Sequence, residues 1–163
     1  MRAIEIEKVV INIGCGEGGE KLDNAKKLLE TITGKKILIT KTHKRTTFGA
    51  AKGRPIGCKV TLRGGDAKEF LKKALDAVGK KLPKSVFDAQ GNFSFGIKEH
   101  IDIPGTRYDP DIGIYGMDIC VTLQRKGFRV LRKKLKSKIG RRHKIAPEEA
   151  KQFVIKNFEV VVE

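Results

Sequence analysis

The first residues of the chain alternate between apolar and polar and then become continuously apolar. Ile and Glu alternate over residues 4–7, and Val9-Val10-Ile11 follows without interruption. Alternation is typical of a strand with one buried face, and an unbroken apolar run is typical of a strand inside a sheet. The pattern therefore predicts a first strand over residues 4–13.

Four later segments carry the same strand signals. Residues 37–39 are Ile-Leu-Ile, and over residues 58–63 apolar side chains alternate with Lys, Thr and Arg. This alternation predicts a strand whose outer face is basic. Residues 93–97 and 117–123 predict two further strands, on either side of a connection rich in Gly and Pro around residues 104–110.

Three segments have helical spacing instead. Apolar residues recur every three or four positions over residues 22–32, where Gly34 is placed to end the helix. A second stripe runs from Asp66, the expected N-cap, to Leu82. A third helix is expected from Pro147 through residue 154, with acidic residues in its first turn. Helices and strands in this order predict an α+β protein.

The length of 163 residues suits one globular domain, of which 39% is hydrophobic. We expect an α+β core over residues 1–123. We expect residues 124–163 to form a basic extension and a C-terminal helix packed on the same domain.

A formal net charge of +16 changes this picture from a generic domain to a binder of polyanions. Nucleic acid is the first candidate partner and an anionic membrane surface is the second. No apolar run is long enough for a signal peptide or a membrane span, so we expect a soluble, intracellular protein.

The positive charge lies in two stretches, residues 35–63 and 125–144, that contain no Asp or Glu. Such concentration indicates an electrostatic footprint for nucleic acid. An amphipathic membrane segment in the second stretch is the alternative, although Gly127 and Gly140 dilute its apolar face. A second alternative is that the basic residues form a solvated run of charge with no binding partner. The basic residues are Lys35, Lys36, Lys41, Lys44, Arg45, Lys52, Arg54, Lys59 and Arg63 in the first stretch, and Arg125, Lys126, Arg129, Arg132, Lys133, Lys134, Lys136, Lys138, Arg141, Arg142 and Lys144 in the second.

A rival motif is the G-x-G-x-x-G formed by Gly14, Gly16 and Gly19 between the first strand and the first helix, the context of a dinucleotide-binding fingerprint. Glu17 and Glu20 would place negative charge where a pyrophosphate should lie. We interpret the glycines as a tight turn that allows two stretches of backbone to approach closely.

Other enzymatic chemistry has weak support. Five acids between residues 99 and 118 could furnish a metal-dependent nuclease, but their spacing forces no convergence, and His100 and Cys58 lack recognisable catalytic partners. The three cysteines are far apart in sequence, and we expect them to be reduced and mostly structural. We therefore expect no enzyme, no metal and no cofactor. The five acids are Glu99, Asp102, Asp109, Asp111 and Asp118.

Four segments together resemble one family. They are residues 9–14 (Val-Val-Ile-Asn-Ile-Gly), 55–64 (Pro-Ile-Gly-Cys-Lys-Val-Thr-Leu-Arg-Gly), 91–99 (Gly-Asn-Phe, then Gly-Ile-Lys-Glu) and 116–119 (Gly-Met-Asp-Ile). In this order the chain resembles the ribosomal protein L5 family from about residue 6 to residue 153. The basic extension resembles the archaeal and eukaryotic branch of that family.

The resemblance implies a two-layer fold, with a mainly antiparallel sheet packed against helices and a basic C-terminal extension. It implies a structural constituent of the large ribosomal subunit that binds 5S rRNA in the central protuberance and contacts 23S-type rRNA. It further implies a neighbouring 5S-binding ribosomal protein, a small-subunit head protein across the subunit bridge and a cytoplasmic location in the ribosome, with no membrane partner.

The resemblance also assigns residues. Asn12, Lys35 and Thr61 match family positions that contact 5S rRNA, and Lys35 stands where Gln is common. A loop over residues 48–55 resembles the family's loop that reaches P-site tRNA, although Ala51 departs from its pattern. The expected RNA-binding residues are Asn12, Lys35, Thr61, Lys41, Lys44, Arg45, Lys59, Arg63, Arg132, Lys133, Arg141 and Arg142. The expected tRNA-contacting residues are Phe48, Gly49, Lys52, Gly53, Arg54 and Pro55.

Overall fold

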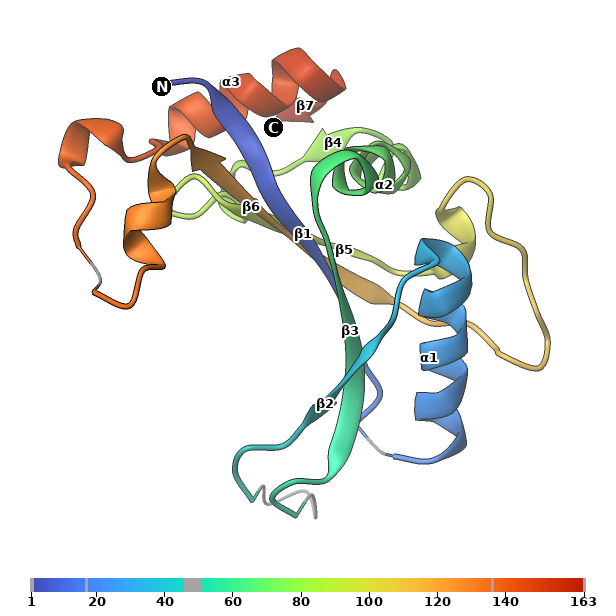
Figure 1. Cartoon of the computed structure of the whole chain (residues 1–163). Helices are drawn as coiled ribbons and strands as arrows, with labels where there is room; N and C mark the ends of the chain where they lie inside the picture. The colour runs from blue at the N-terminus through green and yellow to red at the C-terminus, as the bar shows by residue number, and fades with distance from the viewer. Residues whose placement is uncertain (1, 17, 46–50, 136, 163) are drawn as a thin grey trace. The chain divides into compact units, whose positions relative to one another are not determined.

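A computed structural model describes residues 2–16, 18–45, 51–135 and 137–162 (Figure 1). It is an α+β fold with three α-helices and a mainly antiparallel five-stranded sheet, in agreement with the predicted class. The strand order of this sheet is β2-β3-β1-β6-β5, and β4 and β7 form a second, parallel pair. The strands are β1 (Ile4–Gly14), β2 (Leu38–Lys41), β3 (Pro55–Leu62), β4 (Lys81–Leu82), β5 (Phe93–Ile97), β6 (Met117–Arg125) and β7 (Val161–Val162). The helices are α1 (Glu20–Thr33), α2 (Gly64–Ala77) and α3 (Pro147–Phe158), with 3₁₀ helices η1 (Lys84–Val86), η2 (His100–Asp102), η3 (Phe128–Leu131) and η4 (Arg141–His143).

Contacts divide the chain into two compact units. Unit 1 comprises Met1–Val9, Leu62–Phe95 and Cys120–Glu163, and unit 2 comprises Val10–Thr61 and Gly96–Ile119. The predicted division of the chain between residues 123 and 124 stays a prediction.

In unit 2, α1 forms where the apolar spacing predicts it. Leu22 and Leu29 are among its buried residues, and Gly34 ends it in the left-handed conformation, donating its N–H to Glu30 O at 2.8 Å. The connection before β6 is tied to this helix by Tyr115, whose hydroxyl donates to Lys21 O at 3.0 Å. The amphipathic helix therefore keeps its buried side on the core of the unit.

In unit 1, α2 differs from its prediction at both ends. Asp66 is not the N-cap, because Arg63 occupies that position. Asp66 lies in the first turn, where its negative charge interacts favourably with the helix dipole. The helix ends at Ala77 because Gly79 and Lys80 both have positive φ, 70° and 57°. Leu82 is buried as predicted, but it belongs to β4 instead of the helix.

The basic extension contains no long helix within its described residues. It forms η3 and η4 and is fixed by the buried side chain of Ile145. Ile145 packs beside Gly91, where an added Cβ would meet Ile145 Cγ2 at 2.7 Å. The α3 helix begins at Pro147 as predicted, and the Glu149 carboxylate accepts the Ala146 N–H at 3.2 Å.

Candidate nucleic-acid interface

Strand alternation in unit 2 collects polar side chains on one face of the sheet. Ile11 and Ile13 of β1 are buried, so Asn12 between them points to the opposite face and is half-buried. On the neighbouring strand β3, Cys58 and Val60 are buried in the same way. Their partners on the opposite face are Lys59, which is half-buried, and Thr61, which is exposed.

The pairing of β1 with β3 brings these residues together. Cys15 N–H donates to Ile56 O at 2.9 Å, and an added Cβ on Gly57 would meet Ile13 O at 2.7 Å, so β1 and β3 run antiparallel. Continued along the strands, this pairing sets Asn12 beside Lys59, with Thr61 two positions further on the same face. We call Asn12, Lys59 and Thr61 the sheet patch.

The glycine motif forms a turn as predicted, because Gly16 and Gly19 have positive φ, 72° and 100°, and Gly16 N–H donates to Ile56 O at 3.0 Å. The close backbone approach that was predicted for the motif glycines is made instead by Gly18, where an added Cβ would be 3.3 Å from Pro55 O. The backbone N–H of Gly16 is therefore occupied by a carbonyl and does not form a phosphate cradle. A dinucleotide-binding fold needs parallel strands connected by helices, and this sheet is mainly antiparallel, so the structure does not support that alternative.

The basic loop after β2 is closed at its base by Thr42. Its hydroxyl donates to Ala51 O at 2.6 Å and accepts the Arg54 N–H at 3.2 Å, and its backbone makes two further bonds, with Arg54 and Gly53, at 2.9 Å each. Sequence reasoning did not single out Thr42. A Thr can bond its own neighbourhood in this way, but nothing in the local sequence specifies a partner nine residues away.

Around this closure the described basic residues of the loop are exposed. Lys41 pairs with Pro55 at the end of the β2–β3 ladder. The expected contacts Phe48 and Gly49 lie outside the described residues. The exposed expected residues are Lys41, Lys44, Arg45, Lys52, Gly53 and Arg54, whereas Pro55 is half-buried.

Lys35 directly follows the Gly34 that ends α1, as expected. Its side chain is exposed, and its backbone N–H donates to Thr33 Oγ1 at 3.4 Å. Its position is thus set by the end of the helix.

In unit 1, two of the expected RNA-binding arginines share one carboxylate. Arg132 Nη2 lies 2.8 Å from Glu7 Oε2, and Arg63 Nη1 lies 3.5 Å from Glu7 Oε1. Arg132 also donates to Gln124 Oε1 at 2.9 Å. Glu7 is 10% exposed, so this acid holds both guanidinium groups on β1. Sequence reasoning missed Glu7 because its partners are distant in the chain.

The remaining expected residues of unit 1, Lys133, Arg141 and Arg142, are exposed on the basic extension. The end of this extension is fixed by Arg125, which is 4% exposed and donates to Lys144 O at 3.3 Å and to Glu149 Oε2 at 2.7 Å. The Ala146 N–H and the Arg125 guanidinium hold the pKa of the Glu149 carboxyl below its ordinary value. Glu149 therefore stays ionised as the counter-charge of a buried arginine.

All three cysteines are free thiols, but they differ in exposure. Cys58 is buried, and burial raises the pKa of its thiol to about 11; Cys15 is half-buried, and burial raises its pKa as well. Cys120 is exposed. The first two thiols are thus protonated at neutral pH and unsuited to nucleophilic chemistry. Among the described residues, no three His, Cys, Asp or Glu side chains are grouped closely enough to hold a metal ion.

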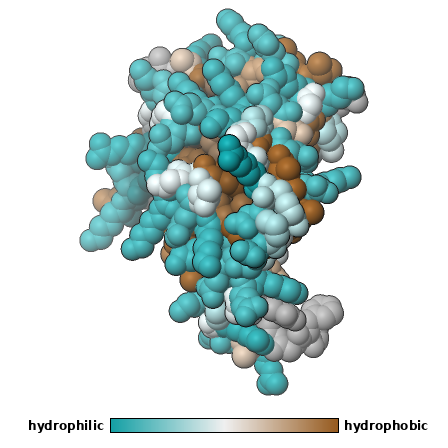
Figure 2. All heavy atoms as spheres, turned by 90° about the vertical axis from the view of Figure 1, so that its right-hand side faces the viewer, coloured by the Kyte–Doolittle hydropathy of each residue, from teal (hydrophilic) through white to brown (hydrophobic). Residues whose placement is uncertain are grey.

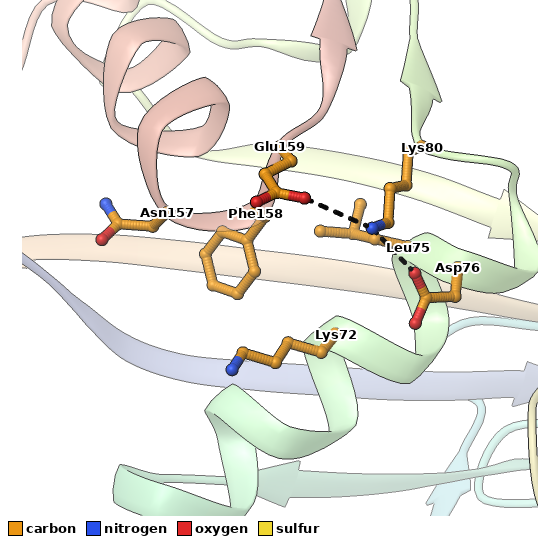
Figure 3. Close-up of a pocket in the computed structure, with 7 residues that line it drawn as sticks. All are labelled: Lys72, Leu75, Asp76, Lys80, Asn157, Phe158 and Glu159. Carbon is orange, nitrogen blue, oxygen red and sulfur yellow. Dashed lines mark ion pairs between the residues drawn. The ribbon is translucent and has the colours of Figure 1, made fainter.

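A small cavity of about 230 Å³ in unit 1 lies between the C-terminal ends of α2 and α3 (Figure 3). The Lys80 ammonium lies 3.4 Å from Asp76 Oδ1 and 3.9 Å from Glu159 Oε2. Both Lys80 and Glu159 have positive φ, and Lys80 O accepts the Val161 N–H at 2.8 Å. The Lys80 ammonium and its two carboxylate partners therefore link the C-terminal ends of the two helices, whereas the Lys72 side chain on the same wall is not part of this group.

The face seen in the space-filling view is mostly hydrophilic, with a few apolar patches between the polar side chains (Figure 2). In the described part of the chain, no helix combines the length and apolarity needed to cross a bilayer. Membrane binding by the basic extension would require an amphipathic helix, but in its described part residues 128–131 and 141–143 form only short 3₁₀ turns.

Comparison with known proteins gives one consistent result. A family model described as ribosomal protein L5 matches residues 1–47, and the model for the C-terminus of the same ribosomal family matches residues 55–161. The chain is 54% identical to the large ribosomal subunit protein uL5 of Sulfurisphaera tokodaii, over 99% of this chain and 93% of the relative. It is 48% identical to uL5 of Methanoregula boonei, over 99% of each chain, and 46% identical to uL5 of Methanosphaera stadtmanae, over 97% and 95%.

Proposed function

The chain belongs to the ribosomal protein L5 family, a family of structural constituents of the large ribosomal subunit and not of enzymes, and from this premise we propose that it binds 5S rRNA through the sheet patch. The similar relatives are archaeal, as the basic extension led us to expect. The observation that carries the proposal is the grouping of Asn12, Lys59 and Thr61 on one face of adjacent strands.

Physical chemistry supports a division of roles within this patch. The Lys59 ammonium attracts phosphate and contributes salt-sensitive affinity. The Asn12 amide and the Thr61 hydroxyl project from neighbouring strands of the sheet and can both donate and accept hydrogen bonds. They would orient the RNA and favour one RNA shape over another.

The test compares 5S rRNA with a length-matched control RNA. We expect Asn12→Ala and Thr61→Val each to weaken 5S rRNA binding by about 3- to 30-fold, the value of a lost hydrogen bond to a polar or charged partner, and to weaken control binding much less. Asn157→Ala on α3 and Thr31→Val on α1 remove the same groups elsewhere and should leave both affinities unchanged.

The measurement is equilibrium binding at low and high salt. A preference for 5S rRNA that survives high salt supports specific recognition, because the counterion-release contribution is then weak. Equal losses on both RNAs, or affinities that collapse together as salt rises, contradict the assignment and leave a general polyanion binder.

A second part of the proposal concerns the loop that Thr42 closes. We propose that its exposed Lys52 and Arg54 contact P-site tRNA, since basic side chains held beside a hydrogen-bonded loop base suit phosphate contact. Contacts with 23S-type rRNA through the basic extension, with a neighbouring 5S-binding protein and with a small-subunit head protein are proposed on family membership alone. Crosslinking of tRNA to this loop in assembled ribosomes tests the tRNA contact.

A further inference from the structure

A larger cavity, of about 550 Å³, lies in unit 1. Its size falls in the range of about 300–1,000 Å³ that is typical of small-molecule sites. It is formed by the first part of β1, the turn before β5, the end of β6 and the basic extension. It is lined by Glu7, Gln90, Asn92, Thr122, Leu123, Phe128, Leu131, Lys138, Ile139, Arg141, Lys144 and Ile145.

Part of the cavity wall is apolar and aromatic. Leu123 and Ile145 are buried, Phe128 and Ile139 are half-buried, and Leu131 is 45% exposed. The Phe128 ring has a set orientation because it meets the ring of His143 edge-on at 5.6 Å. This wall resembles the aromatic surfaces on which unstacked bases lie.

Among the uncharged polar side chains of the wall, Asn92 is fixed by hydrogen bonds. Asn92 Oδ1 accepts the Leu123 N–H at 3.1 Å, and Asn92 Nδ2 donates to Asp88 Oδ2 at 3.1 Å. The Gln90 and Thr122 side chains have no such hydrogen bond within the described residues and can face the edge of a ligand.

The charge around the cavity favours an anion. Its single acid, Glu7, is neutralised by Arg132 at 2.8 Å and Arg63 at 3.5 Å. Lys138, Arg141 and Lys144 are exposed, and none of them forms an ion pair with another residue of the described chain. An apolar pocket with an unpaired basic rim thus fits a flat ring that carries a phosphate.

We propose that this cavity receives one unpaired nucleotide of RNA, its base against Phe128 and the aliphatic wall and its phosphate on the basic rim. The inference shares with the proposed function only the class of ligand, because the sheet patch is in unit 2 and this site is in unit 1. In this proposal the basic extension binds an extruded base as well as phosphate groups.

The experiment is an NMR titration of the full chain, observed at the methyl groups of Leu123, Ile139 and Ile145. The probes are the single-stranded pentanucleotides of adenosine and of uridine, and an RNA duplex that offers no unpaired base. We expect these methyl signals to shift saturably with a pentanucleotide and to remain in place with the duplex. Equal shifts with the pentanucleotides and with the duplex, or no shift with any of the three probes, overturn the proposal.

Substitutions separate stacking from charge. Phe128→Leu keeps an apolar side chain and should weaken pentanucleotide binding by about 5- to 100-fold, whereas Phe153→Leu on α3 should not change it. Lys138→Ala should make the pentanucleotide affinity less dependent on salt concentration than Lys156→Ala does, because Lys156 lies outside the cavity. Thermal unfolding shows that each variant is folded. Unchanged affinity in a folded Phe128→Leu variant overturns the site.

The sheet patch provides the distinguishing control. Asn12→Ala should leave the pentanucleotide titration of the cavity unchanged even where it lowers 5S rRNA binding. A loss of cavity shifts in that variant overturns the independence of the two sites. Failure of 5S recognition alone would leave the cavity assignment standing.

Discussion

Replacing Glu149 by Gln should destabilise the protein, because it leaves a buried guanidinium without its counter-charge. Arg125 is 4% exposed, and its Nη2 lies 2.7 Å from Glu149 Oε2. Its Nε has no hydrogen-bond partner in the described chain, so the remaining polar contact is the Lys144 carbonyl at 3.3 Å. The amide oxygen that replaces the carboxylate would still accept the Ala146 N–H, so the start of α3 is preserved.

The magnitude follows from this geometry. A hydrogen bond to a charged group contributes about 1.5–3 kcal/mol, but the Glu149 side chain is 46% exposed and water screens part of the attraction. We therefore expect a loss of about 1–2 kcal/mol in the free energy of unfolding. For a chain of this size that corresponds to a decrease in Tm of about 2–8 °C.

The pH dependence has a definite sign. Because folding lowers the Glu149 pKa, the pair contributes fully above the ordinary carboxyl value of 4.5 and its contribution is lost as pH falls through the lower, folded-state pKa. The difference in Tm between the wild-type protein and Glu149→Gln should thus be full at pH 7 and shrink in acid.

The assay is thermal unfolding by circular dichroism across this pH range, with Glu148→Gln as control. Glu148 is exposed, lies in the same helical turn and loses the same charge, so it separates the Arg125 contact from the helix dipole. Equal Tm values for the two variants at pH 7, or a difference that persists unchanged in acid, would refute the reasoning.

Three further outcomes are expected. Gly57→Ala should lower Tm by several degrees, since its Cβ would lie 2.7 Å from a backbone oxygen, whereas Gly65→Ala, with open space, should not; calorimetry that finds both unchanged contradicts this. A thiol reagent at pH 8 should label exposed Cys120 rapidly and buried Cys58 only on unfolding, as mass spectrometry would show, and similar rates would count against the burial argument. Thr42→Val should speed hydrogen exchange of the loop amides about tenfold, and unaltered protection would show that the hydroxyl does not close the loop.

The elements that the sequence predicts well are those with a long, clear period. The alternation in β5 and β6 and the stripe in α1 leave one face buried, and the structure buries those faces. The predicted end of α2 was wrong, because Leu82 lies four residues after Val78 and so continues the helical spacing although it belongs to β4. Gly79 was the available signal, and the left-handed Lys80 that follows it is a conformation that composition does not predict. The two-residue strand β7 has too few residues to show a period.

The candidate site shows a different limit, since charge can be counted in a sequence but its pairing cannot. Arg63 and Arg132 share Glu7, and Arg125 is buried against Glu149, so these arginines are partly committed to the fold. A phosphate that displaced them would have to offset the lost protein contacts. The charge available to RNA in unit 1 is therefore concentrated on the exposed residues of the basic extension, among them Lys138 and Arg141. A substitution there should change the salt dependence of binding without changing stability, and substitution of the committed arginines should change both.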